Sequence, residues 1–353
     1  MPVPGAALSY SEARSPGVLA LLDGAPVLGT IEAHVTSTGC HAADRFELCV
    51  ATSADPLMGA VFWGDIAGVQ IDLQFNVGFG FVSLIQGYVD SVVIDPLAGT
   101  ARVAGRDLSA GLIEARTQET FANHTSSEIA TILAGRHGLG AQVQATTTPV
   151  GRYWELEHDH ITLDQFSRST TEWDLLAGLA EREGFDAWVA GTTLFFQPPA
   201  TAVSPAAVIR PVPTPNGPPN VTWLRLERAL TLAQPISVSV KSWNSRMAQT
   251  FVQTATTQGS SGVPLQYSFV LPNLTPDVAL QMAQRRLDEL VRHERVVTAE
   301  MPGELSISAH GLLGLEGTGT AFDQAYRVDE VERSIDARSG FRQTVRARNM
   351  SVF

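Results

Sequence analysis

Hydrophobic and polar residues alternate with a period of two through much of the first hundred residues. The alternation is clearest over residues 30–35, 46–50 and 69–75. A period of two places one set of side chains on each face of a strand, so each stretch is predicted to be a half-buried β-strand. Residues 95–99 read Asp-Pro-Leu-Ala-Gly, which is typical of a turn between two further strands. The pattern favours an antiparallel barrel or curled sheet.

The period changes to helical spacing beyond residue 120. Thr125 to Glu128 form a capping box, in which the first side chain accepts from the third helical amide and the glutamate reaches back. Apolar residues then follow on one face, and Gly135 or Gly138 is expected to end the helix.

A second predicted helix opens with another capping box, Ser169 to Glu172, and closes at Gly184. Residues 187–189 and 193–196, joined through Ala190-Gly191-Thr192, are expected to form a hairpin. The segment is therefore predicted to be a small α/β unit.

Proline is frequent from Pro198 to Asn220, so this stretch is expected to be extended, without regular ladder bonding. Strand patterns return over residues 236–241 and 341–348. A single helix interrupts them, capped by Thr275 with a proline in its first turn and ending near His293.

The predicted fold class is α+β, mainly β. We expect a first tube-like β-barrel domain over residues 1–107, a small α/β domain over 108–199, a proline-rich linker over 200–220, and a second tube-like β-barrel domain over 221–353. The last contains a helical excursion at about 275–293. With 353 residues, two or three domains are expected.

Composition narrows the class of function. Hydrophobic residues are 44% and charged residues 17%, as in a folded globular protein, and the formal net charge is -12. An acidic chain does not favour gripping nucleic acid, because that binding neutralises phosphates with Lys and Arg. The charge suits a conduit along which DNA slides without sticking.

Cys40 and Cys49 lie at no metal-type spacing, so we interpret them as two reduced thiols made in a cytosol. Residues 19–22 form a short apolar run near the N-terminus but follow no basic leader, so no signal peptide is expected. No stretch reaches the roughly 20 apolar residues of a membrane span.

Three blocks of the chain carry a resemblance to a known family. The first includes Gln86 to Val92 and Val103 to Leu108, the second Phe121 to Thr125 and Trp173 to Gly184, and the third Val238 to Trp243 and Tyr326 to Val328. In this order they resemble the phage late-control protein D family, which comprises the baseplate hubs of contractile phage tails and is similar to the hub portion of type VI secretion spikes. The resemblance spans nearly the whole chain.

The resemblance implies a homotrimer in which each subunit contributes two similar β-barrels, so that three chains form a pseudo-sixfold ring continuing the tail tube. It implies a tube protein, a central spike protein, baseplate wedge or sheath-initiator proteins and a tape-measure protein as partners, with DNA passing through the lumen. It places the protein in the virion tail baseplate, assembled in the host cytoplasm. Since the chain stops at Phe353, any spike or muralytic domain is expected to be a separate chain.

The predicted function is therefore a structural hub that joins tail tube to spike, without enzymatic activity. One alternative is a hub of a type VI secretion or bacteriocin-like contractile device. Another, from a different class, is a tail-tip enzyme that degrades peptidoglycan. A third is a stand-alone carbohydrate-binding β protein. It is disfavoured because the aromatic residues of this sequence form no evident exposed ladder.

Three features suggest chemistry or binding, and none is assigned a catalytic, metal or cofactor role. His158-Asp159-His160 could place two imidazoles on one strand face, but zinc needs further ligands. Gly135 to Gly140 follows a helix rather than a strand, so it is interpreted as a helix stop and not a phosphate loop. Neither a carboxylate pair across a cleft nor a Gly-x-Ser-x-Gly elbow is evident. Charged residues of the last helix are interpreted as a solvated face, with a docking face as the alternative: Arg285, Arg286, Asp288, Glu289, Arg292, Glu294 and Arg295.

Overall fold

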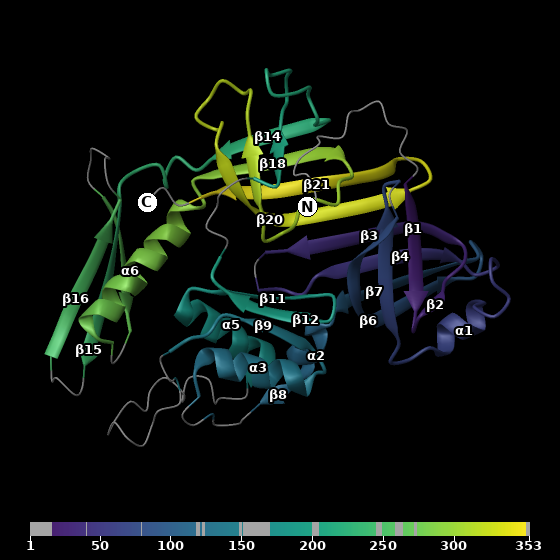
Figure 1. Cartoon of the computed structure of the whole chain (residues 1–353), viewed down its shortest axis with the longest axis horizontal. Coiled ribbons are helices and arrows are strands. Elements are labelled where there is room, and N and C mark those ends of the chain that lie inside the picture. The colour runs from purple at the N-terminus through teal and green to yellow at the C-terminus, as the bar shows by residue number, and fades with distance from the viewer. Residues whose placement is uncertain are drawn as a thin grey trace, which may run out of the picture.

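A computed structural model describes residues 16–39, 41–78, 80–117, 121, 124–147, 150, 170–199, 205–244, 249–257, 264–271 and 274–350. Its largest element is a 13-stranded sheet that crosses the molecule (Figure 1). The sheet's main path runs β14-β18-β21-β20-β3-β4-β7-β6-β5-β1-β2, and every neighbouring pair on it is antiparallel. The predicted mainly-β class is confirmed.

The sheet draws its strands from both ends of the chain. Those from the N-terminal half are β1 (Gly17–Leu22), β2 (Ala25–Pro26), β3 (Thr30–Thr38), β4 (Arg45–Ala51), β5 (Gln70–Asn76), β6 (Phe81–Asp95) and β7 (Thr100–Asp107). Those from the C-terminal half are β13 (Ala207–Ile209), β14 (Trp223–Arg228), β18 (Arg295–Pro302), β19 (Leu312–Leu315), β20 (Ala325–Asp336) and β21 (Gly340–Asn349).

One strand pair joins the two halves. β20 pairs with β3 from Glu330 opposite Thr38 to Asp336 opposite Glu32. The two predicted β segments therefore share one ladder of backbone hydrogen bonds. Pairing among the described strands does not close either half into a barrel of its own, so the expected barrels remain a prediction.

A small α/β unit lies against this sheet and has its own core. Helix α3 (Ser126–Arg136) begins at the predicted capping box of Thr125 and Glu128. The second predicted box is displaced by two residues: Thr171 caps α5 (Glu172–Glu183) and Asp174 completes the box, because Thr170 still pairs as a strand. The unit also contains α2 (Ser109–Glu114), β8 (Arg116–Thr117), β9 (Gly140–Val143), β10 (Thr170–Thr171), β11 (Asp186–Ala190) and β12 (Thr193–Gln197).

The predicted helix stop at Gly184 and the predicted hairpin at Gly191 are both confirmed. Gly184 takes a left-handed conformation at the end of α5, with φ of 71°. Gly191, φ 54°, turns β11 into β12, where Ala190 pairs with Thr193.

The C-terminal half carries a third layer at the left of Figure 1. There β15 (Ile236–Asn244), β16 (Gln249–Thr256) and β17 (Leu265–Val270) form a separate sheet, and α6 (Pro276–Val291) packs on it. Thr275 caps α6 with the proline at its first position, as predicted.

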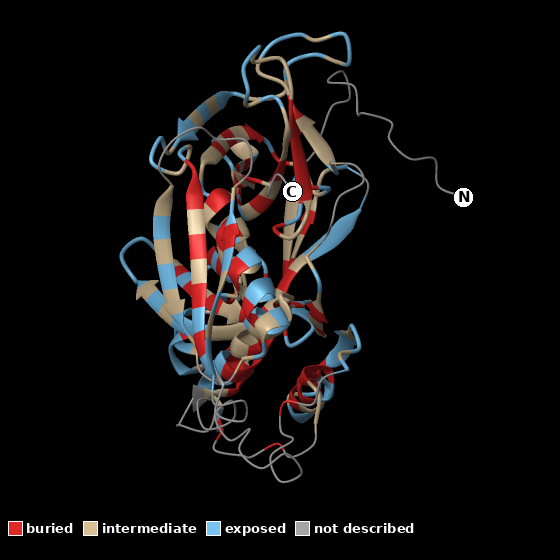
Figure 2. Ribbon diagram, turned by 90° about the vertical axis from the view of Figure 1, so that its left-hand side faces the viewer, coloured by how far each residue is buried: buried red, intermediate tan, exposed pale blue. Residues whose placement is uncertain are grey.

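Among the described residues, the buried side chains form four hydrophobic clusters, one in each β half of the large sheet, one in the α/β unit and one beneath α6. Figure 2 shows a strand on which buried residues alternate with intermediate ones. The domain boundaries predicted after residues 107, 199 and 220 remain a prediction.

One expectation about the proline-rich stretch is wrong. Ala207–Ile209 forms β13, which pairs in parallel with β19. The three residues lie between Pro205 and Pro211, so each keeps the amide that ladder bonding requires. None of the helices among the described residues is both long and apolar enough to cross a membrane.

Gly105 allows the close approach of β4, β6 and β7. A Cβ there would lie 1.9 Å from the carbonyl oxygen of Tyr88 and 2.6 Å from the ring of Phe46. We predict that Gly105→Ala lowers the free energy of unfolding by about 3 kcal/mol, measured by urea denaturation. Gly135→Ala is the control: a Cβ on this helical glycine meets nothing within 4 Å, and alanine favours helix. Equal stability losses in the two variants would contradict the account.

Candidate functional site

Across β21, β20, β3, β4 and β7, the face of the large sheet that points away from Ala33 and Val35, here called its outer face, is largely polar. On β3, Ala33 and Val35 are fully buried, while the alternate residues Glu32, His34 and Thr36 are partly exposed. The same alternation continues through β20 and β21 on one side and β4 and β7 on the other. Because the strands are in register, these residues form one surface that crosses both halves of the chain.

Charges on this face nearly balance. Arg102 contacts Glu32 and Glu47 at 2.9 Å each, and Arg342 contacts Glu300 at 3.3 Å. On β14, β18, β21, β20, β3, β4, β7 and β6 the acids outnumber the arginines by two: the acids are Glu32, Glu47, Asp90, Asp95, Glu227, Glu300, Asp329, Glu330, Glu332 and Asp336, and the arginines are Arg45, Arg102, Arg106, Arg225, Arg327, Arg342, Arg346 and Arg348.

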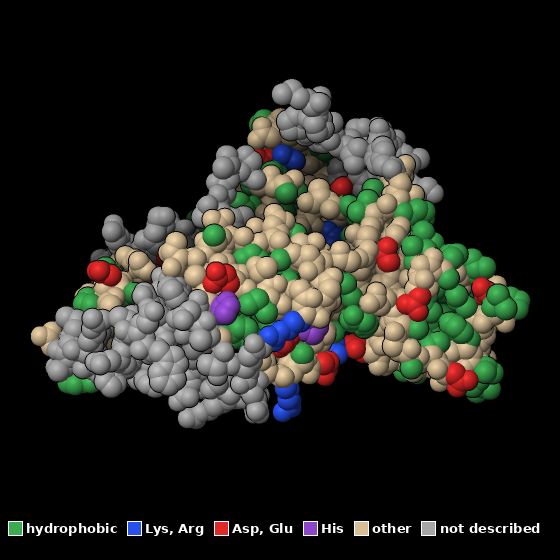
Figure 3. Space-filling view, turned by 60° about the horizontal axis from the view of Figure 1, so that its bottom comes forward, with side chains coloured by type: hydrophobic (Ala, Val, Ile, Leu, Met, Phe, Trp, Pro, Cys, Tyr) green, Lys and Arg blue, Asp and Glu red, His purple; other side chains and the backbone are tan. Residues whose placement is uncertain are grey.

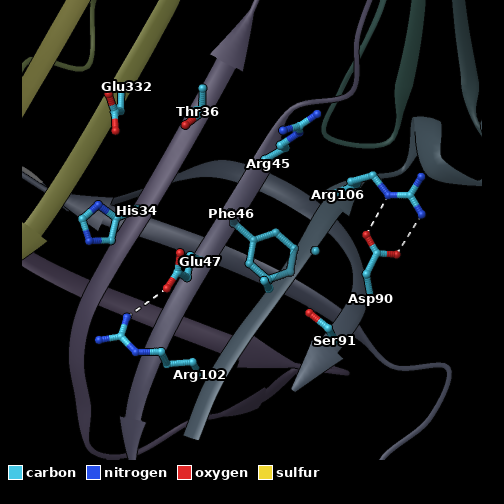
Figure 4. A pocket seen from close by; sticks show the side chains of 12 residues that line it. His34, Thr36, Arg45, Phe46, Glu47, Asp90, Ser91, Arg102, Arg106 and Glu332 are labelled. Carbon is cyan, nitrogen blue, oxygen red and sulfur yellow. Dashed lines mark hydrogen bonds and ion pairs between the residues drawn. The ribbon is translucent and has the colours of Figure 1, made fainter. Parts of the chain in front are cut away.

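An open hollow of about 660 Å³ lies on this face where β20, β3, β4, β7 and β6 meet (Figure 4). His34 and Glu332 point into it from one side and Arg106 from the other. Arg102 and Arg106 both engage carboxylates of the sheet itself. Internally paired charges are typical of a hydrated wall rather than of a pocket that binds a charged ligand.

The sheet contains the same arrangement of four strands twice. In the first half, β3, β4, β6 and β7 lie in the spatial order β3-β4-β7-β6. In the second, β14, β18, β20 and β21 lie in the order β14-β18-β21-β20. In chain order both read first, second, fourth, third, and in both a tight turn joins the last two strands. We infer that the two halves are copies of one supersecondary unit.

A bulge with an ion pair recurs at the same place in both copies. The ladder of β6 and β7 shifts register between Val89 and Ser91, and that of β20 and β21 between Val328 and Glu330. The extra residue is an aspartate in each case, Asp90 and Asp329.

Each bulge aspartate binds an arginine on the neighbouring strand. Arg106 donates from Nε to Asp90 at 2.6 Å and from Nη2 at 3.0 Å. Arg348 Nε lies 2.5 Å from a carboxylate oxygen of Asp329. In both copies a Val-Asp-x-Val segment supplies the bulge, and the arginine is followed by a buried Asp107 or Asn349.

A buried acidic pair lies where the sheet meets the α/β unit. The backbone amide of Asp44 donates to the Asp107 carboxylate at 3.1 Å, and the amide of Thr38 donates to the Asp44 carboxylate at 2.8 Å. Burial, together with the neighbouring Asp107, raises the pKa of Asp44 to about 7. Burial likewise raises the pKa of Asp107 to about 6, although hydrogen bonds from Ser109 oppose the shift.

This pair should make stability depend on pH. Because the pKa of Asp44 in the folded chain exceeds its ordinary value of 3.8, its contribution is full below that value and is lost as pH rises through about 7. We predict that the melting temperature of Asp44→Asn minus that of the native chain increases as the pH is raised from 4 to 8, measured by thermal unfolding. Asp65→Asn, at an exposed position on α1 (Ala60–Asp65), is the control. A difference between Asp44→Asn and the native chain that is constant over this range would contradict the assignment.

The glycine-flanked segment after α3 has a structural role. Gly138 has a positive φ of 68° just beyond the helix end, as expected of a helix stop. Arg136 and His137 contact the carboxylate of Glu172 at 3.0 and 2.6 Å, and that glutamate is buried at the start of α5. The segment therefore joins two helices.

Two other candidate sites have different outcomes. His158-Asp159-His160 lies outside the described residues, so the metal hypothesis there stays untested. Within the part of the chain that the structure describes, no three metal-ligating side chains gather. Cys49 is a buried free thiol, and Cys40 lies outside the described residues.

The charged face of α6 is not wholly solvated, which corrects the interpretation from sequence. Arg285 donates to the carbonyl oxygen of Arg182 and Arg286 binds Glu181, both near the end of α5. Helix C-terminal carbonyls attract guanidinium groups, so these arginines fix α6 to the α/β unit.

Comparison with known proteins gives matches by structure only. No family model and no curated protein sequence matches the chain. The fold is similar to a tail protein from Neisseria meningitidis MC58, with a TM-score of 0.73, 13% identity, and 95% of this chain and 96% of that one covered. It is also similar to the 43 kDa tail protein of prophage MuSo2 from Shewanella oneidensis, with a TM-score of 0.72, 17% identity, and coverage of 95% and 98%.

A third neighbour comes from a secretion machine. The E. coli c3393 protein, a component of the type VI secretion system, matches with a TM-score of 0.56 and 11% identity, covering 92% of this chain and 74% of that one. The resemblance to baseplate hubs and type VI spike hubs drawn from the sequence is thus confirmed at the level of the fold: this chain has the fold shared by these phage tail and type VI secretion proteins.

Proposed function

We propose that this chain is the hub subunit of a contractile tail baseplate. Three copies form a ring with pseudo-sixfold symmetry that joins the tail tube to a central spike. The function lies in its surfaces, and we assign it no catalytic residue and no cofactor.

The repeated four-strand unit is the observation that carries this proposal. A sixfold tube needs six equivalent contacts, and a threefold spike needs three. A trimer whose subunits each carry a single contact unit offers only three, so it cannot match the tube. A chain with two equivalent units offers six of them in a trimer, while its two non-equivalent additions, the α/β unit and the α6 layer, repeat only three times. Each unit has an aspartate bulge at the same place and an ion pair from that aspartate to an arginine on the neighbouring strand.

The polar outer face supplies a wall for the conduit. Its acids and arginines nearly balance, and several of them neutralise each other directly. Polymers rich in phosphate bind tightly only where basic residues are in excess, so a balanced wall lets DNA and a tape-measure protein pass. We place this face, which is outer only with respect to the hydrophobic clusters of the chain, toward the lumen of the ring.

The remaining partners follow from this orientation. With the sheet inside, the α/β unit and the α6 layer lie where wedge or sheath-initiator proteins would approach. The ends of the strands face the tube protein on one side and the spike on the other. The virion baseplate is the proposed location.

A hub of a type VI secretion or bacteriocin-like device is the second candidate, supported by the similarity to c3393. Both machines need the same ring, so the chain's architecture is common to them. Neighbouring genes separate the two, because capsid and terminase genes accompany only a phage.

The proposal predicts a mass of three chains in solution. We expect light scattering of the purified chain, alone or with its spike and tube proteins, to give a trimer that persists on dilution, since permanent interfaces of this kind bury roughly 2,000 Å² or more. A chain that stays monomeric at high concentration, and that forms no ring when spike and tube proteins are added, would contradict it. A zymogram on peptidoglycan that shows clearing would favour an enzyme instead.

A further inference from the structure

Among the backbone edges of the large sheet that no described strand covers, two belong to the repeated four-strand units. β14 pairs only with β18, so its other edge is open along Trp223–Arg228. β5 pairs with β6 only as far as Tyr88, and the last bond there runs from the Val89 amide to Val69. Beyond it, residues 91–95 of β6 pair with β7 alone. Open edges are templates for another strand.

The repeat indicates what these edges pair with. Within one chain, the two copies of the four-strand unit meet where β20 of the second copy pairs with β3 of the first. β6 occupies the place of β20 in the first copy, and β14 occupies the place of β3 in the second. The open edges of β6 and β14 are thus equivalent to the edges of β20 and β3 that pair with each other inside the chain.

The bulges fix the residue equivalence of β20 and β6. Asp329 and Asp90 are the extra residues of the two bulges. Counting three residues onward from each, Glu332 on β20 corresponds to Val93 on β6.

Strand pairing carries the equivalence to the other edge. Arg106 and Arg348 bind the two bulge aspartates and so correspond. Each arginine pairs with a residue on the next strand of the sheet, and that residue pairs with one on the strand beyond. These two steps lead to corresponding residues on β3 and β14. The first path runs Arg106, Arg45, Thr36, and the second runs Arg348, Val296, Glu227.

Since Glu332 pairs with Thr36 inside the chain, we propose that Val93 of one copy pairs with Glu227 of a second copy in an antiparallel ladder between β6 and β14. This rests on the proposed ring and specifies its subunit contact. The same register sets Ser91 opposite Ala229, Asp95 opposite Arg225, and Leu97 beside Trp223.

The side chains along this register are complementary. Asp95 and Arg225 carry opposite charges at directly opposed positions, which stabilises a strand pair. Leu97 is 100% exposed in the single chain, Val93 64% and Trp223 48%. Exposed apolar side chains on facing edges are typical of a surface that another copy covers.

The location fits a subunit contact as well. Figure 3 shows hydrophobic side chains gathered at the right-hand end of the molecule, the end that carries α1 in Figure 1. A Cβ on Gly64 of α1 would lie 3.7 Å from the side chain of Ile94 on β6. Three copies joined this way have six alike junctions, three within chains and three between them, so neither edge of any four-strand unit stays open.

Paired cysteines test the register. In a Cys40→Ser, Cys49→Ala background, Val93→Cys combined with Glu227→Cys places two thiols directly opposite each other across the proposed ladder, within disulfide reach. We expect oxidation to give linked chains that end at three on a non-reducing gel.

Two matched variants control this test. Thr36→Cys with Glu332→Cys is the equivalent pair inside one chain and should form a disulfide without joining chains. Val93→Cys with Arg228→Cys directs the second thiol to the opposite face of β14 and should link little.

The outcomes separate the two claims. A trimer by light scattering whose Val93→Cys, Glu227→Cys pair stays unlinked, or links no better than the Arg228→Cys control, overturns the register and leaves the ring. A chain that is monomeric under all conditions overturns the ring itself and the register with it.

A charge series gives an independent reading. Val93→Glu would place a second negative charge opposite Glu227 of the next copy. We expect this repulsion to raise the concentration below which the trimer dissociates by about threefold per junction. Val93→Lys would face the same glutamate with opposite charge and should not weaken the trimer. Equal weakening by both variants would overturn the assigned pair.

Discussion

The pairing of β20 with β3 is the contact on which the rest of this structure depends. It merges strands from the two ends of the chain into one antiparallel sheet. Backbone amides and carbonyls at a strand edge must be paired or hydrated, so this junction also fixes how the two halves sit. The continuous polar face exists because the junction keeps both halves in one register.

The other parts of the molecule support this junction. The Trp173 indole donates to the carbonyl oxygen of His41 at 2.7 Å, close to the end of β3. Arg327 on β20 binds Asp186 of the α/β unit, and both side chains are largely buried. The α/β unit thus contacts both halves of the joined sheet, at the connection between β3 and β4 and on β20.

Much of the local structure could be predicted from sequence, because capping boxes, glycine stops and alternating strands depend on neighbouring residues. Thr125, Gly184 and Thr275 act as predicted. The displaced cap at Thr171 shows the limit of such rules, since a short strand pairing decided where the helix begins.

The two aspartate bulges of the sheet were harder to predict, because they depend on pairing between distant segments. The segments containing Asp90 and Asp329 share only a short Val-Asp-x-Val pattern and lie 239 residues apart in the numbering (329 − 90). Their equivalence becomes evident only when both are seen as bulges that bind an arginine on the next strand. The short strand within the proline-rich stretch was missed likewise, because its partner β19 lies about a hundred residues away.

Electron cryo-microscopy of the purified chain, with its spike protein if assembly requires it, tests the central claim most directly. The account predicts a threefold ring whose inner wall is a closed sheet with six alike sectors and strand β6 of each copy beside β14 of the next. A ring in which these two edges remain apart, or particles that contain a single chain, would contradict it.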